Sequence, residues 1–314
     1  RRPEVDEPRI PSFDLLNLPR PPSSRPWAYV KVAEGCDRSC GFCAIPSFRG
    51  PQRSRSVGSI LAEVDELDVR EIVLVAQDLA SFGRDQGVGE RSIVPLVAKV
   101  AERVDRVRLL YLYPSDLTDG LIDAVLDTGV AYFDLSLQHV SRPLLRRMRR
   151  WGDGDRYRER IASIRATRPD AVFRSNFIVG YPGETEAEFQ HLLDWMDEAQ
   201  LDRIGCFKYE NVAGARSNDL PDHVAEDVKQ DRWNRFMEKS QAISEAKLAA
   251  KVGKRLDVII DEIDAEGATC RTQADAPEID GNLFIDEGFE GLSVGDIVSV
   301  EVDEASEYDL WGKL

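Results

Sequence analysis

Residues 29–55 have the sequence YVKVAEGCDRSCGFCAIPSFRGPQRSR, which places Cys36, Cys40 and Cys43 directly after a β-strand pattern. The cysteine spacing is Cys-x3-Cys-x2-Cys. Thiolates are soft ligands that select zinc, copper(I) or iron–sulfur clusters. A structural zinc site usually takes four protein ligands, but no second cysteine pair follows, and the chain has only 3 histidines. Three thiolates would leave one iron of a four-iron cluster open to a small molecule. A zinc site completed by a distant fourth ligand is the alternative.

The composition fits one large domain followed by a small one. The chain has 314 residues, of which 42% are hydrophobic, and this is enough to bury a sizeable core. No apolar run approaches about 18 residues, so we expect no membrane-spanning helix. The 5 cysteines are odd in number and three are clustered, which argues against a secreted disulfide framework. These features predict a cytoplasmic protein.

The net charge opposes a nucleic-acid partner. The chain has 41 Lys and Arg residues against 57 Asp and Glu residues, a formal charge of −16. Nucleic-acid binding generally uses a basic face. The overall charge therefore makes a nucleic acid an unfavourable direct substrate, although it leaves room for a local basic patch.

Three segments follow from the pattern along the chain. Residues 1–25 are rich in proline and lack apolar periodicity, which is typical of an extended linker. Because the sequence does not begin with Met, we expect this linker to come from an amino-terminal domain that is missing from it. Residues 26–250 alternate short β-branched runs with amphipathic stretches, and residues 251–314 contain short β runs separated by glycines.

The middle segment predicts an α/β fold. Six strands are expected, at residues 28–32, 71–76, 107–113, 132–137, 172–179 and 203–209. Strands that alternate with helices form parallel sheets with right-handed crossovers. Six units are too few for a full eight-stranded TIM barrel. The last segment predicts a small closed all-β barrel, with strands at residues 256–263, 268–272, 282–285, 297–302 and 306–311.

Polar and glycine residues follow the predicted strands. Gln77 and Gln138 come at two strand ends, and Gly180 and Gly183 come at a third. The carboxyl ends of the strands are where chemistry collects in a parallel barrel. Arg174 lies within an otherwise apolar strand, and a buried arginine needs an anionic partner. A non-catalytic binding module would not place such residues at every strand end.

The cysteine loop, with Phe42 before its last cysteine, resembles the signature of the radical S-adenosylmethionine (SAM) superfamily. The resemblance implies an open, partial (β/α)6 TIM-like barrel. It also implies a [4Fe-4S] cluster held by Cys36, Cys40 and Cys43, with SAM bound through its amino and carboxylate groups to the fourth iron. Reductive cleavage of SAM then gives a 5′-deoxyadenosyl radical. On this basis the turn with Gly180 and Gly183 is expected to contact the adenine side of SAM.

Other polar residues are assigned to the same ligand. Arg174 is a candidate for the SAM carboxylate, and Gln77 and Gln138 for its amino group or ribose. Arg49, Arg53 and Arg55 follow the cysteines and could offset the charge of a cluster. His139 and Cys206 are interpreted as core residues, and Cys270 has no assigned role.

Further motifs resemble the methylthiotransferases within that superfamily. They are Arg49-Gly50-x3-Ser54-Arg55, the run FIVGYPGET at residues 177–185, and a terminal barrel similar to the TRAM domain. The resemblance implies a second [4Fe-4S] cluster on the missing amino-terminal domain, an external electron donor and a sulfur source.

Two branches of this family compete. One modifies the β-carbon of an aspartate in ribosomal protein twelve of the small subunit, and the other modifies adenosine in tRNA. Residues 251–314 contain 5 Lys and Arg against 17 Asp and Glu, a formal charge of −12. This charge repels phosphate backbones and attracts a basic protein. Residues 201–209, 232–237, 274–281 and 307–312 also resemble the ribosomal-protein branch, so we expect that branch. A charge that serves only solubility is the alternative.

Overall fold

The computed structural model describes residues 23–87 and 93–314. The linker predicted for residues 1–25 therefore lies almost entirely outside the described residues. None of the described helices combines the length and the apolarity that a membrane span needs.

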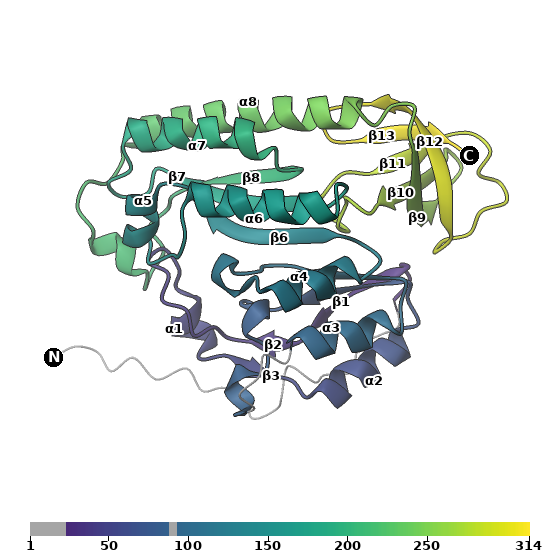
Figure 1. Ribbon diagram of the computed structural model, residues 1–314, viewed down its shortest axis with the longest axis horizontal. Helices are drawn as coiled ribbons and strands as arrows, with labels where there is room; N and C mark the ends of the chain where they lie inside the picture. The colour runs from purple at the N-terminus through teal and green to yellow at the C-terminus, as the bar shows by residue number, and fades with distance from the viewer. Residues whose placement is uncertain (1–22, 88–92) are drawn as a thin grey trace.

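The large domain is built on two three-stranded parallel sheets that continue each other (Figure 1). The first has the order β1 (Trp27–Lys31), β4 (Glu71–Val75) and β5 (Arg106–Leu109). The second has the order β6 (Tyr132–Gln138), β7 (Val172–Val179) and β8 (Arg203–Lys208). A parallel bridge between Leu112 and Leu135 joins them. The six-stranded partial barrel is therefore confirmed, although β5 ends at Leu109 and not at residue 113.

Helices cover the outer face of this partial barrel, as Figure 1 shows. They are α2 (Val57–Leu67), α3 (Ile93–Ala101), α4 (Asp119–Leu126), α5 (Arg142–Arg147), α6 (Gly154–Thr167), α7 (Glu186–Ala199) and α8 (Glu226–Ala249). Thr185 and Glu188 form a capping box at the start of α7, which satisfies two otherwise unpaired N–H groups. Phe177 of β7 packs against the rings of Trp195 and Phe236 on α7 and α8. The outward face of the strands is thus the main hydrophobic core.

The terminal segment forms a closed five-stranded barrel, which we call the terminal barrel. Its strands are β9 (Arg255–Ile263), β10 (Ala268–Thr272), β11 (Leu283–Ile285), β12 (Ile297–Ala305) and β13 (Leu310–Lys313), in the order β10-β11-β13-β12-β9. Cys270 is fully buried in its core. The predicted closed barrel is confirmed.

The terminal barrel docks on the amino ends of the partial-barrel strands. Residues 273–282, which we call the floor loop, connect β10 to β11 and enter the interior of the partial barrel. Ala274 and Ala276 pack there against Val73 and Val172. The Tyr29 hydroxyl donates to the Pro277 carbonyl oxygen at 2.6 Å. The floor loop therefore closes this end.

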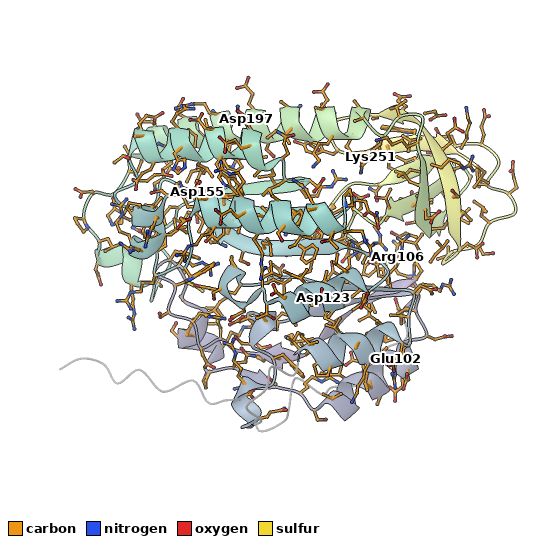
Figure 2. The ribbon with its side chains drawn as sticks, in the orientation of Figure 1. Glu102, Arg106, Asp123, Asp155, Asp197 and Lys251 are labelled. Atoms are coloured by element: carbon orange, nitrogen blue, oxygen red, sulfur yellow. The ribbon has the colours of Figure 1, made fainter. Side chains whose placement is uncertain are left out.

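Buried charges complete the contact between the two units. Glu71 pairs with Arg108, and its other oxygen lies 2.9 Å from Arg271 Nη2. Arg271 also pairs with Asp261. Burial works against ionisation of Glu71, but the guanidinium groups of Arg108 and Arg271 hold its pKa below the ordinary value. Figure 2 places Arg106 at this junction, where it donates to the Asp257 carbonyl oxygen at 3.2 Å.

Candidate functional site

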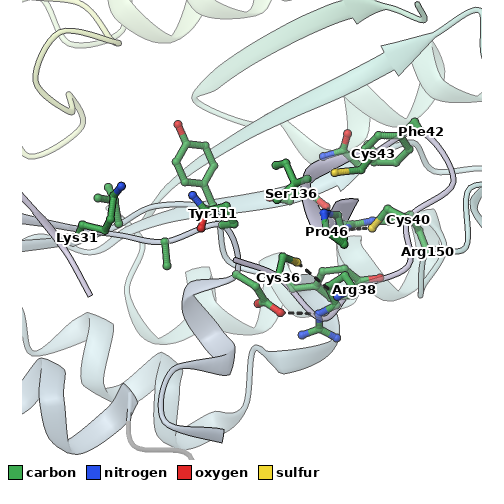
Figure 3. A pocket seen from close by; sticks show the side chains of 17 residues that line it. Lys31, Cys36, Arg38, Cys40, Phe42, Cys43, Pro46, Tyr111, Ser136 and Arg150 are labelled. Carbon is green, nitrogen blue, oxygen red and sulfur yellow. Dashed lines mark hydrogen bonds and ion pairs between the residues drawn. The ribbon is translucent and has the colours of Figure 1, made fainter. Parts of the chain in front are cut away.

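A cavity of about 340 Å³ opens at the carboxyl ends of the strands (Figure 3). Cys36, Cys40 and Cys43 all line it, together with Gln77 and Gln138. Its size falls within the usual range for small-molecule sites, roughly 300–1,000 Å³. The structure thus brings together five of the eight residues predicted for the site.

Backbone hydrogen bonds hold the cysteine loop against the strand ends. The Cys36 N–H donates to the Gly50 carbonyl oxygen at 3.1 Å, and the Gly35 N–H donates to Gln77 Oε1 at 2.9 Å. Gly35 has φ +83°, and a Cβ there would lie 2.2 Å from the Pro51 carbonyl oxygen. Only glycine fits this approach. Gln77 therefore has a definite task in the protein itself, which is to anchor the start of the loop.

The three thiols are free and partly shielded from water. Burial raises the pKa of Cys36 to about 11 and also raises the pKa of Cys43. Arg150 Nη1 donates to Cys40 Sγ at 3.4 Å, and the Arg38 N–H donates to Cys36 Sγ at the same distance. A metal centre would have to displace the thiol protons, because thiolates are the ligating form. Nearby N–H donors favour that form.

The three cysteines are one fewer than the four ligands that a structural zinc ion usually takes. Among residues 23–87 and 93–314, no three His, Cys, Asp or Glu side chains are placed to hold one ion. In an iron–sulfur cluster each thiolate binds a separate iron, so the ligands need not converge on one point. The donor set, three thiols around one cavity, fits a cluster better than a zinc knot.

Two arginines in the cavity wall were not predicted from the sequence. The guanidinium carbons of Arg38 and Arg150 lie 4.0 and 3.9 Å from the centre of the Tyr113 ring. Arg38 also pairs with Asp78 at 2.6 Å and with Asp116. Arg38 lies between two of the cysteines, which is a signal that could have identified it. Arg150 ends a run of basic residues that resembles a solvated helix surface, so the sequence concealed its role.

The glycines of the predicted SAM contact do not line the cavity. Gly180 and Gly183 have φ of +75° and +78° and form the turn after β7. The Gly183 N–H donates to the Asp222 carbonyl oxygen at 2.8 Å. Between them, the Tyr181 hydroxyl donates to the Arg147 carbonyl oxygen and would lie only 2.6 Å from a Cβ on Gly41. The turn therefore packs beside the cysteine loop instead of facing the cavity.

Arg174 is placed differently from the expectation. It does not line the cavity, and its Nη1 and Nε lie 3.1 Å from Asp134 and 3.5 Å from Asp280. Asp280 belongs to the floor loop. The protein itself supplies the anionic partners that a buried arginine needs. The reason for assigning Arg174 to the SAM carboxylate is thereby removed.

Arg49, Arg55 and His139 each have partners within the protein. Arg55 is buried and donates to the carbonyl oxygens of Lys31 and Ser59, and Arg49 pairs with Glu34 at 3.1 Å. His139 is fully buried, accepts from the Ser141 N–H and lies 3.2 Å from Glu184. Its prediction as a hydrogen-bonded core residue is confirmed.

Comparisons with known proteins agree with the fold and the motifs. The sequence matches the radical SAM superfamily over residues 30–196 and the TRAM domain over residues 252–314. It is 56% identical to the "Ribosomal protein uS12 methylthiotransferase RimO" of Cereibacter sphaeroides, over 92% of this chain and 65% of that protein. A protein of the same name from Jannaschia sp. is 54% identical, over 97% of this chain and 69% of that protein. The chain thus spans about two thirds of the length of these relatives.

The fold also matches a solved structure of low sequence similarity. Coproporphyrinogen III oxidase (HemN) from Escherichia coli, described as a radical SAM enzyme, aligns with a TM-score of 0.54 at 16% identity. The alignment covers 70% of this chain and 53% of that one. At this identity the match concerns the fold alone.

Proposed function

This chain belongs to the radical SAM superfamily and, within it, to the RimO family, and from that premise we propose that it methylthiolates the β-carbon of an aspartate in ribosomal protein uS12. The observation that carries the proposal is the cavity at the carboxyl ends of the strands, into which three free cysteines open. Because ribosomal proteins are cytoplasmic, this proposal places the enzyme in the cytoplasm.

We assign the cofactors to residues of this cavity. Cys36, Cys40 and Cys43 would hold a [4Fe-4S] cluster, and Gln77 and Gln138 would line the space for SAM. When bound, the reduced cluster supplies the electron that splits SAM into methionine and a 5′-deoxyadenosyl radical. Gly180 and Gly183 would not contact SAM directly. They would form the turn that supports the cysteine loop.

The protein contributes positioning and shielding in this scheme. Gln77 holds Gly35 and so fixes where the first cysteine lies. Arg150 donates to Cys40 Sγ and stabilises negative charge on the thiolate. The floor loop closes the opposite end of the barrel, while the cavity opens at the carboxyl ends of the strands. A shielded site protects a radical from side reactions.

The complete reaction needs parts outside this cavity. An external reductant must supply the electron, and a sulfur source must supply the inserted atom. The methylthiotransferase resemblance also implies a second cluster on a separate amino-terminal domain, and we propose that sulfur insertion depends on it. Hydrogen abstraction, in contrast, would need only this cavity with its cluster and SAM bound, together with the electron from the reductant.

The terminal barrel supports a basic protein as substrate over tRNA. Its segment carries a formal charge of −12, which repels phosphates. Asp261 and Asp275 are committed to buried arginine pairs, which leaves most of its acidic groups to the surface. This barrel lies at the amino ends of the strands, so a partner that contacts both it and the cavity must extend along the molecule (Figure 1).

Deuterium transfer tests this function directly. The reconstituted chain would be given SAM, a strong reductant and a uS12 peptide deuterated at the aspartate β-carbon. We expect deuterium in the 5′-deoxyadenosine product. Deuterium from labelled tRNA adenosine, with none from the peptide, would favour the tRNA branch. No 5′-deoxyadenosine from any mixture would refute radical SAM chemistry in this cavity.

A further inference from the structure

Lys31 is the last residue of β1, and its side chain lines the cysteine cavity. It is paired with Val75 of β4, so its backbone is fixed within the parallel sheet. In Figure 3 Lys31 lies at one end of the cavity and the cysteines lie at the other, with Tyr111 between them. The side chain is 46% exposed, which leaves its ammonium group open to an incoming ligand.

The ion pairs around the cavity leave Lys31 with only part of a counter-charge. Its Nζ lies 2.8 Å from Glu34 Oε2, while Arg49 Nη1 lies 3.1 Å from the other oxygen of the same carboxylate. Two cations therefore share one anion. Glu34 is almost fully buried, whereas the side chains of Lys31 and Arg49 are about half exposed to solvent. The single charge of Glu34 can neutralise only one of these two cations.

The other cations that line the cavity are already committed within the described residues. Arg38 pairs with Asp78 and Asp116 and stacks on Tyr113. Arg150 donates to Cys40 Sγ and to the Ser136 carbonyl oxygen, and it covers the other face of the same ring. Neither can turn toward a second ligand without breaking these contacts. Of the three cations that line the cavity, Lys31 is therefore the one that can donate hydrogen bonds to an incoming carboxylate.

We propose that Lys31 binds the side-chain carboxylate of the substrate aspartate and so selects aspartate over asparagine. The inference rests on the proposed function, and it names the residue that recognises the modified side chain. A carboxylate that leaves water for a partly enclosed cavity needs a cationic hydrogen-bond donor. The ammonium group of Lys31 meets that need, and its distance from the cysteines leaves the space between them for SAM.

If Lys31 binds the carboxylate, its removal should reduce the preference for an aspartate peptide over an asparagine peptide. In Lys31→Met the stem remains and the charge is removed, whereas Lys31→Arg keeps the charge. Lys99→Met, on the exposed face of α3, is the matched control. Binding of two uS12 peptides, one with aspartate and one with asparagine at the modified position, would be measured by calorimetry with the reconstituted chain and SAM.

We expect the unaltered chain to prefer the aspartate peptide. Lys31→Met should bind that peptide roughly 10- to 100-fold more weakly, the range for loss of a charge-assisted hydrogen bond, and should bind the asparagine peptide as before. Lys31→Arg should keep most of the preference, and Lys99→Met all of it. Thermal unfolding would verify that each variant is folded.

Three results would overturn the proposal. Equal weakening of both peptides in Lys31→Met would show a general effect on the cavity. An unchanged preference would show that another group reads the carboxylate. Weaker SAM binding in the absence of peptide would assign Lys31 to SAM. Failure of the proposed function is recognised separately, because the unaltered chain would then cleave SAM but bind neither peptide.

Discussion

The two ends of the partial barrel use their charged side chains in opposite ways. At the amino end the floor loop fills the interior, and the carboxylates of Glu71 and Asp261 neutralise Arg108 and Arg271 in a buried contact. At the carboxyl end the interior stays open, and Arg150 and Lys31 face a cavity. Buried ion pairs that no ligand can reach stabilise the fold. Cationic side chains that line an open cavity can bind a ligand. The terminal barrel creates this difference because it closes one end only.

Substitution of the cysteines tests the role of the open end most strongly. Replacing any one of Cys36, Cys40 or Cys43 by Ala should abolish formation of 5′-deoxyadenosine, since each thiolate would hold one iron. The product would be measured by chromatography after anaerobic reconstitution. The same change at Cys206, which packs against the core outside the cavity, should leave most of the activity. Activity retained in a cavity variant would contradict the assigned ligand set.

At the amino end, the largest effect should be on stability. Arg271→Met leaves Glu71 and Asp261 buried without their shared partner. Breaking a buried ion pair in this way costs about 3–5 kcal/mol of the unfolding free energy, which urea denaturation would measure. Arg255→Met is the control, because Arg255 is exposed and lies 3.8 Å from Glu301. A loss as small as that of the control would mean that the interface does not depend on this network.

The pH dependence of the unfolding free energy tests the same buried ion pairs. The pKa of Glu71 is lowered by Arg108 and Arg271 even though burial opposes it. Its carboxylate therefore stabilises the fold above its ordinary pKa of 4.5, and this stabilisation is lost as the pH falls through the lower folded value.

Glu71→Gln should thus be less stable than the unaltered chain by about 2 kcal/mol at pH 7, less than the full cost of breaking a buried pair because Gln still accepts hydrogen bonds. The difference should shrink in acid, below the ordinary pKa of a glutamate. Stability curves of the two proteins between neutral pH and pH 3 would be compared. A difference that stays constant across this range would show that Glu71 does not act through its charge.

The smallest effect is expected where a charge pair spans the same two units at the surface. Arg25 Nη1 lies 2.6 Å from Glu262 Oε2, but the two side chains are 46% and 55% exposed. Exposed pairs of this kind contribute at most about 1 kcal/mol. Arg25→Ala should therefore change the unfolding free energy by less than about 1 kcal/mol in the same denaturation assay. A loss comparable to that of Arg271→Met would refute the contrast between buried and exposed pairs.

Local signals predicted the fold and the thiol set well. The cysteine spacing, the capping residues Thr185 and Glu188, and the β-branched runs all act over a few residues, so each is visible in the sequence. The partners of Arg174 are not, because Asp280 lies in another domain and is brought back by the floor loop. Tyr132 and Asp280 bond at 2.6 Å although 148 residues separate them. Arg150 and Lys31 likewise acquire their roles only when strand ends and loops meet.

The most direct test of the central claim is the metal content of the chain after anaerobic reconstitution. The account predicts about four irons and an equal number of sulfides per chain, as expected for one four-iron cluster on three cysteines. The variant in which Cys36, Cys40 and Cys43 are all Ala should bind essentially none. Stoichiometric zinc in the unaltered chain, or full iron binding in the variant, would contradict the account.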